Sequence, residues 1–392
     1  MYKEIKVTWN TENNKLKTHN DYFVPFHVPS FLGSEFDFIK SNFRPDYLIS
    51  GYEQCNIFFE SYYPQSSSFL VNSCSSALEV ALRVLNVKEG DEVIIPGFGY
   101  VAVANAVLIN GAKPVLADVS AIDGNIDVSS IEKSITPQTK AVIAIHYAGR
   151  AFEIDSILQI CNKYGIYLIE DAAQAMGVKF NGQPLGSFGD IACLSFDYMK
   201  NISCGQGGLL IVNNKNLNDR AYAMLENGVN KKDLAMGRAY VFDWLCAGSN
   251  LKMNPIASFF LFEHLKEYEK ITFQRISVWN YYCSLLSNLK ERGIIRFPEL
   301  SLHHNGHIFF IITGSKEEKQ RLRSYLREKH IFCEPHYSLL TDTTFGREVI
   351  TTQNDLTASK IFCESLLRLP IWNSISSTHI ETVVNAIHKF YS

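Results

Sequence analysis

The sequence has no stretch of about 18 apolar residues, which is the length that a membrane-spanning helix needs. It also has no excess of charge of either sign, because its 37 basic and 40 acidic side chains leave a formal charge of −3. A basic surface for nucleic acid or for an anionic membrane is therefore not expected, and neither partner is predicted. The N-terminal sequence MYKEIKVTWNTENNKLKTHND lacks the apolar core of a signal peptide, so we expect a cytoplasmic protein.

Cysteine is present but not in the patterns that bind metals or form disulfide frameworks. The nine cysteines are an odd number, none forms a CxxC pair, and most lie in apolar segments, as reduced core thiols do. His303, His304 and His307 are close together, but no acidic or cysteine ligand accompanies them, which favours a polar loop over a metal site. No metal is predicted.

The length and composition predict a globular protein of more than one domain. The chain has 392 residues, of which 46% are hydrophobic and 20% charged, and this is more than one compact core usually holds. We predict an N-terminal extension over residues 1–23, a large domain over 24–254, and a bridging helix with a small C-terminal α+β domain over 255–392.

Short β-rich segments alternate with helix-length segments in the first part of the chain. The β-rich segments are FLVNS, EVIIP, KPVLADV, KAVIAIHY, YLIEDAA, IACLSF and GLLIVNN. Segments such as 141–146 are apolar on both faces, which is typical of a mainly parallel sheet covered by helices on each side. The pattern predicts a doubly wound α/β domain, whose ligands bind at the carboxyl ends of the strands.

Two of these strand ends carry residues that suit pyridoxal phosphate (PLP). Asp171 ends the segment YLIED, and Lys200 follows IACLSF just before GQGG. Alone, Asp171 favours a helix cap and Lys200 a solvated surface residue. Together, at neighbouring strand ends, they supply an amine that can hold the cofactor covalently and a carboxylate that keeps its pyridine nitrogen protonated. We predict both as catalytic residues.

Other strand ends could bind the rest of the same cofactor. The segment NSCSSALE follows the FLV strand and would offer backbone N–H groups at a helix N-terminus to a phosphate, with Cys74 and Ser75 in contact and Ser195 adding a hydroxyl. A plain helix cap is the alternative for this segment. Tyr100, just past EVIIP, is predicted to stack on the cofactor ring, because an aromatic side chain usually covers such a ring.

The ordered segments NSCSSALE, PGFGYVAVANA, EDAAQAMG, GSFGDIACLSFDYMKN and GQGG resemble the motif series of the DegT/StrS-type sugar aminotransferases. The resemblance extends over nearly the whole chain after about Val24. It is greatest to transaminases that act on dTDP-4-dehydro-6-deoxy-D-glucose. The resemblance implies the aspartate-aminotransferase-like fold type I of PLP-dependent transferases with a mainly parallel seven-stranded sheet, a homodimer with shared active sites, and L-glutamate as amino donor.

The resemblance also implies further site residues. Gln174 matches the position that contacts the phenolic oxygen of the cofactor, and Asn250 matches an asparagine that reaches the phosphate in the neighbouring subunit. His307, His336 and Tyr337 are in positions where the small domain faces the substrate.

The chain departs from the pattern of the family at three positions. Asp197 stands where histidine is common, Gln206 where glutamate is common, and Lys252 where arginine is common. Asp197 is nevertheless predicted to line the substrate site, because it lies three residues before Lys200.

The predicted reaction moves the amino group of L-glutamate to the C4 ketone of dTDP-4-dehydro-6-deoxy-D-glucose. It gives a dTDP-4-amino-4,6-dideoxy sugar and 2-oxoglutarate, with Lys200 as general acid and base, in the synthesis of a surface polysaccharide such as O-antigen. A 3-keto sugar, a GDP- or UDP-linked sugar and a non-catalytic PLP-binding regulator are the alternatives. A sugar dehydratase of the same family would have histidine in place of Lys200.

Overall fold

The computed structural model describes residues 8–10, 15–17, 23–42, 50–299, 303–350, 352 and 354–392, with only the backbone described for 8–10 and 15–17. Its centre is a seven-stranded sheet with the strand order β3-β11-β10-β7-β6-β4-β5. The strands are β3 (Ser67–Val71), β4 (Glu92–Pro96), β5 (Lys113–Ala117), β6 (Thr139–Ile145), β7 (Tyr167–Asp171), β10 (Ile191–Ser195) and β11 (Gly208–Val212). Each predicted β-rich segment forms one of these strands.

The sheet is mainly parallel, as we predicted from strands that are apolar on both faces. Only β11 runs against its neighbours, since it pairs antiparallel with both β10 and β3. The fold prediction is therefore confirmed: this is the fold type I architecture of PLP-dependent transferases. The parallel pairing of β7 with β10 places Asp171 beside Cys193 in register, so the two strands end at the same edge.

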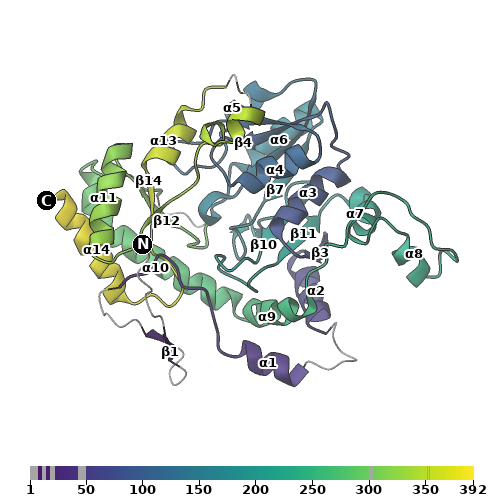
Figure 1. Cartoon of the computed structure of the whole chain (residues 1–392). Coiled ribbons are helices and arrows are strands. Elements are labelled where there is room, and N and C mark those ends of the chain that lie inside the picture. Colours follow the sequence, from purple (N-terminus) through teal and green to yellow (C-terminus); the bar gives the residue numbers. More distant parts are fainter. Residues whose placement is uncertain are drawn as a thin grey trace.

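Alternate residues of the strands pack against helices on opposite faces of the sheet. On β6, Val142 and Ala144 face α2, α6 and α9, whereas Ala141 and Ile143 face α3, α4 and α7. Both faces are thus buried, which explains why the strands are continuously apolar. Figure 1 shows the helices around this sheet, and their bounds are α2 (Ser50–Tyr62), α3 (Cys74–Val84), α4 (Val101–Ile109), α5 (Val128–Ser134), α6 (Ile154–Tyr164), α7 (Asn218–Leu225) and α9 (Pro255–Lys266).

A second, smaller sheet has the order β12-β14-β13 and is antiparallel throughout. It packs against long helices in a separate apolar cluster that includes Trp279, Phe309 and Leu322. These elements are α10 (Tyr268–Glu291), β12 (Phe309–Ile312), α11 (Lys316–Glu328), β13 (Glu334–Pro335), β14 (Leu366–Leu369) and α14 (Ser377–Tyr391). In Figure 1, α9 and α10 run beneath the large sheet toward this cluster. The predicted domain boundary at 254/255 stays a prediction.

The remaining elements are short. They are β1 (Thr8–Asn10), β2 (Lys15–Lys17), α1 (Glu35–Asn42), β8 (Lys179–Phe180), β9 (Gln183–Pro184), α8 (Lys231–Ala235), α12 (Gly346–Val349) and α13 (Thr357–Ser365), with 3-10 turns at 147–149, 215–217 and 340–342. β1 and β2 form an antiparallel pair within the predicted N-terminal extension, and the rest of 1–22 lies outside the described residues. Across the described residues, no helix combines the length and apolar character required to span a bilayer.

One carboxylate joins the large sheet to the segment that precedes the small sheet's central strand. Asp118 follows β5, and its oxygens accept hydrogen bonds from the Ala358 N–H at 2.9 Å and from the Ser359 N–H and hydroxyl at 2.7 and 2.6 Å. Ala358 and Ser359 lie in the first turn of α13, so Asp118 acts as an acceptor for N–H groups at a helix N-terminus. These three hydrogen bonds form a joint between the end of β5 in the large sheet and α13, the helix that leads into β14 of the small sheet.

Candidate active site

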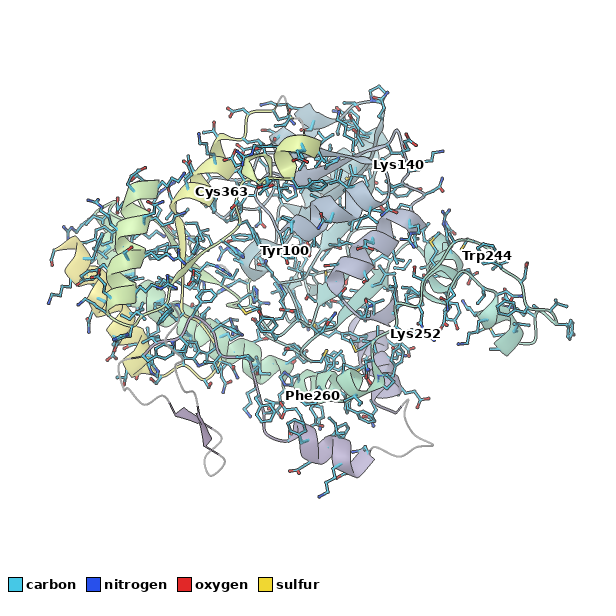
Figure 2. All side chains as sticks on the ribbon, in the orientation of Figure 1. Tyr100, Lys140, Trp244, Lys252, Phe260 and Cys363 are labelled. Atoms are coloured by element: carbon cyan, nitrogen blue, oxygen red, sulfur yellow. The ribbon has the colours of Figure 1, made fainter. Side chains whose placement is uncertain are left out.

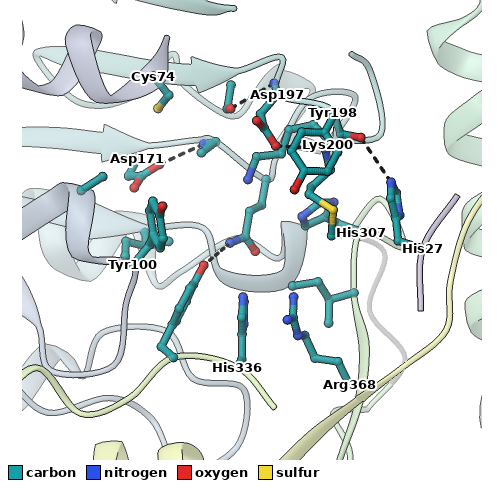
Figure 3. A pocket seen from close by; sticks show the side chains of 18 of the residues that line it. His27, Cys74, Tyr100, Asp171, Asp197, Tyr198, Lys200, His307, His336 and Arg368 are labelled. Carbon is teal, nitrogen blue, oxygen red and sulfur yellow. Dashed lines mark hydrogen bonds between the residues drawn. The ribbon is translucent and has the colours of Figure 1, made fainter. Parts of the chain in front are cut away.

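A cavity of about 640 Å³ opens at the carboxyl ends of the parallel strands, between the two sheets. This volume is typical of a small-molecule site. All of the predicted site residues except Asn250 line it: Cys74, Ser75, Tyr100, Asp171, Gln174, Ser195, Asp197, Lys200, His307, His336 and Tyr337. Figure 3 shows that the labelled members of this set come from separate elements and converge on one space: Cys74, Tyr100, Asp171, Asp197, Lys200, His307 and His336. The structure places these residues together, and their individual roles stay predictions.

Asp171 is the last residue of β7 and is buried. One of its carboxylate oxygens accepts a hydrogen bond from the Ala173 N–H at 3.0 Å. Burial raises the pKa of Asp171, and that hydrogen bond and the nearby charge of Lys200 oppose the rise. A cation placed in the cavity would therefore help to keep this carboxylate ionised.

Lys200 lies in the turn that follows β10, where its backbone N–H donates to the Asp197 carbonyl at 2.9 Å. Within the described part of the chain, no carboxylate lies at ion-pair distance from its amine. Burial lowers the pKa of Lys200, whereas Asp171 and Asp197 are among the nearby groups that raise it. A larger fraction of this amine is therefore neutral than for a solvated lysine, as a nucleophile or a base requires.

The N-terminus of α3 forms one end of the cavity. Ser73 caps the helix by accepting a hydrogen bond from the Ser76 N–H at 3.1 Å, and Ser73, Cys74 and Ser75 at this end of the helix line the cavity. The first N–H groups of a helix have no partner within the helix. The start of β11 passes close by: a Cβ atom on Gly208 would lie 2.5 Å from the Ser73 carbonyl carbon and 2.6 Å from the Cys74 nitrogen. This close approach explains the glycine and shapes a cradle of backbone donors that suits a phosphate group.

The residues around Asp171 and Lys200 thus fit the cofactor that the sequence predicts. Lys200 could hold it covalently, Asp171 could pair with a protonated ring nitrogen, and the α3 N-terminus could receive its phosphate. Tyr100, at the N-cap of α4, keeps 57% of its surface exposed and presents its ring to the cavity, as a stacking residue would. In Figure 3, Tyr100 lies near Asp171 on one side of the space that Lys200 enters.

A hydrogen-bonded network forms the opposite wall. The Gln174 amide donates to the Tyr337 hydroxyl at 3.1 Å and accepts from the Ala148 N–H at 2.7 Å. The Tyr337 ring stacks on His336 with centroids 3.6 Å apart, and His336 Nδ1 lies 2.7 Å from the Tyr147 hydroxyl. Both polar atoms of Gln174 are therefore engaged within the protein, so this side chain is held in one orientation.

His307 is also fixed by a partner within the protein. Its Nδ1 lies 2.8 Å from the Asn201 side-chain oxygen, and Asn201 directly follows Lys200. Burial is the main reason why the pKa of His307 and of His336 falls well below the ordinary value. Both imidazoles are therefore neutral at physiological pH and can act as hydrogen-bond donors or acceptors.

Asn250 lies outside this cavity and lines a second one, of about 680 Å³, together with Tyr52, Asn72 and Lys252. Gln206 borders both cavities. The position of Asn250 is compatible with a role toward a neighbouring subunit, which is how the family resemblance placed it. That role stays a prediction.

Several residues of the cavity were not predicted from the sequence. They are Phe26, His27, Arg275 and Arg368 in the wall, and Asn201 and Tyr147 as partners of wall residues. His27 reaches the cavity from the N-terminal segment, where its Nε2 lies 3.2 Å from the Tyr198 carbonyl oxygen. Arg368 lies in the segment RLP, which also fits the family pattern, but no role was predicted for it. The others belong to no local motif, so only the folded chain shows their place.

Comparisons with known proteins agree with the fold. GDP-perosamine synthase of Escherichia coli O157:H7 is 28% identical over 375 residues, covering 94% of this chain and 99% of that protein. The structure of an aminotransferase from Psychrobacter cryohalolentis superposes with a TM-score of 0.86 at 23% identity, covering 94% of this chain and 98% of the other. NtdA from Bacillus subtilis, solved with bound cofactor PMP, gives a TM-score of 0.83 at 24% identity over 95% of this chain and 86% of the other.

A model of the DegT/DnrJ/EryC1/StrS aminotransferase family matches residues 52–388. The match spans both sheets and includes Cys74, Asp171 and Lys200 as well as Arg368 of the small sheet. The chain therefore belongs to the DegT/DnrJ/EryC1/StrS family of PLP-dependent sugar aminotransferases, which confirms the enzyme class and the cofactor that its sequence predicted.

Proposed function

We propose that this protein transfers the amino group of L-glutamate to the C4 ketone of a nucleotide-linked 4-keto-6-deoxy sugar. The observation that supports this most directly is the meeting of Lys200, Asp171 and the N-terminus of α3 at one edge of the sheet. These groups match the amine, the carboxylate and the phosphate cradle that a PLP transaminase needs. Lys200 also distinguishes the chain from the sugar dehydratases of the same family, which have histidine in place of this lysine.

When bound, PLP supplies an electron sink that stabilises negative charge on the carbon attached to the transferred nitrogen. The side chains of the protein carry out the proton movements around it. The Lys200 amine takes the proton from the α-carbon of glutamate in the first half of the reaction. In the second half, Lys200 delivers a proton to C4 of the sugar.

Asp171 and the neutral imidazoles give this lysine its environment. The buried carboxylate of Asp171 stabilises positive charge on the ring nitrogen of the cofactor, and His307 and His336 add no charge of their own at neutral pH. The Gln174 side chain and the Tyr337 hydroxyl are held in place because they are hydrogen-bonded within the protein. Groups held in this way restrict the orientation in which the sugar ring can present its ketone.

The nucleotide that we propose first is dTDP, with dTDP-4-dehydro-6-deoxy-D-glucose as the keto sugar and a dTDP-4-amino-4,6-dideoxy sugar as the product. The support is the resemblance of the motif series NSCSSALE to GQGG to transaminases of that substrate. A GDP-linked keto sugar is the second candidate, because a relative that aligns with almost the whole chain is named GDP-perosamine synthase. In either case we propose a cytoplasmic step in the synthesis of a surface polysaccharide.

We also propose a homodimer with shared active sites. The support is an apolar arm, defined here as Met236, Tyr240, Val241, Phe242, Trp244 and Leu245, which are 55–95% exposed. Figure 2 shows Trp244 on the projecting part of the molecule that contains α8. The arm leads to Asn250 and the second cavity, so a partner that covers it would also lie next to Asn250.

The position of the cofactor can be tested by reducing the loaded enzyme with borohydride and mapping the modified peptide by mass spectrometry. We expect the label on Lys200. A label on another lysine would refute the assignment.

The substrate can be tested by offering glutamate with a panel of dTDP-, GDP- and UDP-linked 4-keto and 3-keto sugars. The configuration of each product is then solved by NMR. We expect turnover with a 4-keto compound, and turnover only with 3-keto compounds would overturn the proposed position of amination.

The homodimer can be tested by mixing an inactive Lys200→Ala variant with an Asn250→Ala variant. If active sites are shared, each mixed dimer contains one site in which neither residue is changed and one in which both are, so its activity differs from the average of the two parents. Sedimentation as a monomer at all concentrations would contradict the dimer.

A further inference from the structure

Arg368 occupies the cavity wall that faces the sheet. It lies in the middle of β14, in register with Phe310 on one side and Glu334 on the other. Its side chain lines the cavity next to Pro335, His336 and Tyr337. In Figure 3 the guanidinium end lies beside His336 and points into the space between the two walls.

The guanidinium of Arg368 has fewer partners than its donors allow. One terminal nitrogen donates to the Pro335 carbonyl at 3.0 Å, and Nε is buried without a hydrogen-bond partner. No carboxylate among the described residues lies within ion-pair distance of it. A guanidinium offers five N–H donors, and a partly buried cation without an anionic partner is costly. The unused donors therefore indicate an anionic ligand.

Phe26 determines which part of this guanidinium is available. The centre of the guanidinium lies 4.6 Å from the centroid of the Phe26 ring. An aromatic ring in this position covers the flat face of the cation and holds its plane. The edge that carries the N–H groups is left for a ligand, and this edge is the part that binds a planar carboxylate through two parallel hydrogen bonds.

Arg275 is the other arginine that lines the cavity, and its guanidinium is engaged in hydrogen bonds within the protein. Its N–H groups donate to three carbonyl oxygens, those of Gly306, His307 and Ile371, at 3.2, 2.8 and 3.4 Å. These bonds fix the loop that carries His307. Arg275 therefore has a structural task within the protein, whereas in the part of the chain that the structure describes Arg368 makes only its one hydrogen bond to the Pro335 carbonyl.

The proposed reaction offers two kinds of anion, a carboxylate of the amino donor and the diphosphate of the sugar nucleotide. Arg368 is close enough to Lys200 for its charge to influence that amine. The α-carboxylate of the donor is attached to the carbon from which Lys200 removes the proton, so it must lie near Lys200. The diphosphate is separated from the reacting ketone by the width of the sugar ring. The position of Arg368 thus favours the carboxylate.

We propose that Arg368 binds the α-carboxylate of the amino donor and so selects an amino acid for the first half of the reaction. This inference rests on the proposed function. It predicts that Arg368 matters for the half-reaction with glutamate and not for the half-reaction with the keto sugar.

The experiment measures the two half-reactions separately in the loaded enzyme. Glutamate is titrated against the PLP form, and the keto sugar nucleotide that the wild type turns over is titrated against the pyridoxamine phosphate form. The variants are Arg368→Gln, Arg368→Lys and the control Arg321→Gln, which changes an exposed arginine on α11 of the same small-sheet region. A second readout is the dissociation constant of α-methylglutamate, measured from the cofactor absorbance, because this analogue binds without losing an α-proton.

In Arg368→Gln we expect the dissociation constants of glutamate and of α-methylglutamate to rise at least about 30-fold, as for the loss of one partner of a buried charge pair. Arg368→Lys should show a smaller loss of affinity than Arg368→Gln. It keeps the positive charge but lacks the two parallel N–H donors of the guanidinium. The constant for the keto sugar nucleotide and the melting temperature should match those of Arg321→Gln.

Two outcomes would overturn the inference. One is an Arg368→Gln variant that binds glutamate as the wild type does. The other is a variant whose loss falls on the sugar nucleotide, or equally on both substrates, which would assign Arg368 to the diphosphate or to the fold. A wild type that shows no absorbance change with glutamate would instead refute the proposed function, so the two failures are distinguishable.

Discussion

The two walls of the cavity are built in different ways. The sheet wall consists of Cys74, Asp171, Ser195 and Lys200, each at or just past the end of a strand of the large sheet or at the helix that follows it. The small-sheet wall consists of His307, Pro335, His336, Tyr337 and Arg368, which come from the small sheet and its loops. The comparison suggests a division of labour: the sheet wall holds the groups of the chemical steps, and the small-sheet wall recognises what reacts.

The largest difference between the walls should appear on removing Lys200. Lys200→Ala should lower transamination by at least about 10⁴-fold, because it deletes both the attachment point and the base. The measurement is 2-oxoglutarate formation from glutamate in the presence of the keto sugar. Lys215→Ala, which changes an exposed lysine after β11, is the control and should retain activity. Retention of a tenth of the activity in Lys200→Ala would contradict the assignment.

The joint between the walls should affect stability. Asp118→Ala removes the acceptor for the Ala358 N–H and for two groups of Ser359, so we expect the free energy of unfolding to fall by about 2–4 kcal/mol. Urea unfolding measures this change. Glu60→Ala, at an exposed site on α2, is the matched carboxylate control. Equal urea midpoints for the two variants would show that the joint contributes little.

Acid should lower the free energy of unfolding, because the folded protein keeps several buried histidines neutral. Burial lowers the pKa of His27 and of His304 to about 4, and it lowers the pKa of His307 well below the ordinary value. Below about pH 6.5 the unfolded chain therefore binds more protons than the native state, and stability falls as the pH drops toward about 4.

The size of this effect is up to about 1.4 kcal/mol per pH unit for each such histidine. Urea unfolding at several pH values measures it, and His307→Asn should give a shallower dependence, since one such histidine of the small-sheet wall is gone. An unchanged slope in this variant would show that the pKa of His307 is near its ordinary value.

The smallest expected effect concerns Asp197, where the chain departs from its family. The negative charge of Asp197 is among the influences that raise the pKa of Lys200, so Asp197→Asn should lower that pKa. The pH dependence of the labelling of Lys200 by an amine reagent in the cofactor-free protein measures the shift. Asp37→Asn, at an exposed site on α1, is the control. A shift to higher pH would contradict the electrostatic account.

The sequence predicted the sheet wall well, and the reason is physical. Parallel strands bury both faces, so they appear as continuous apolar segments, and their carboxyl ends must meet at one edge. Asp171 and Lys200 could therefore be paired before the structure was known, and their strands are neighbours in register at Asp171 and Cys193. The order of the motifs then led to the family, which the match over residues 52–388 confirms.

The small-sheet wall was only partly predictable. His307, His336 and Tyr337 entered through resemblance to the family, and all three line the cavity. Arg275 was missed, and Arg368 was noticed only as part of the segment RLP, because a local segment does not distinguish a buried arginine from a solvated one. Their burial results from packing between elements far apart in the chain, as with Phe26 and Arg368.

The sequence by itself thus determined the strands, the edge at which the cavity opens, and the lysine and carboxylate that we propose carry the chemistry. These features depend on local periodicity and on residues next to strand ends. Only the tertiary structure decided which cations of the cavity are already bound by the protein and which have donors to spare. That difference between Arg275 and Arg368 depends on the positions of carbonyl groups and of one aromatic ring, which the fold alone brings into contact with them.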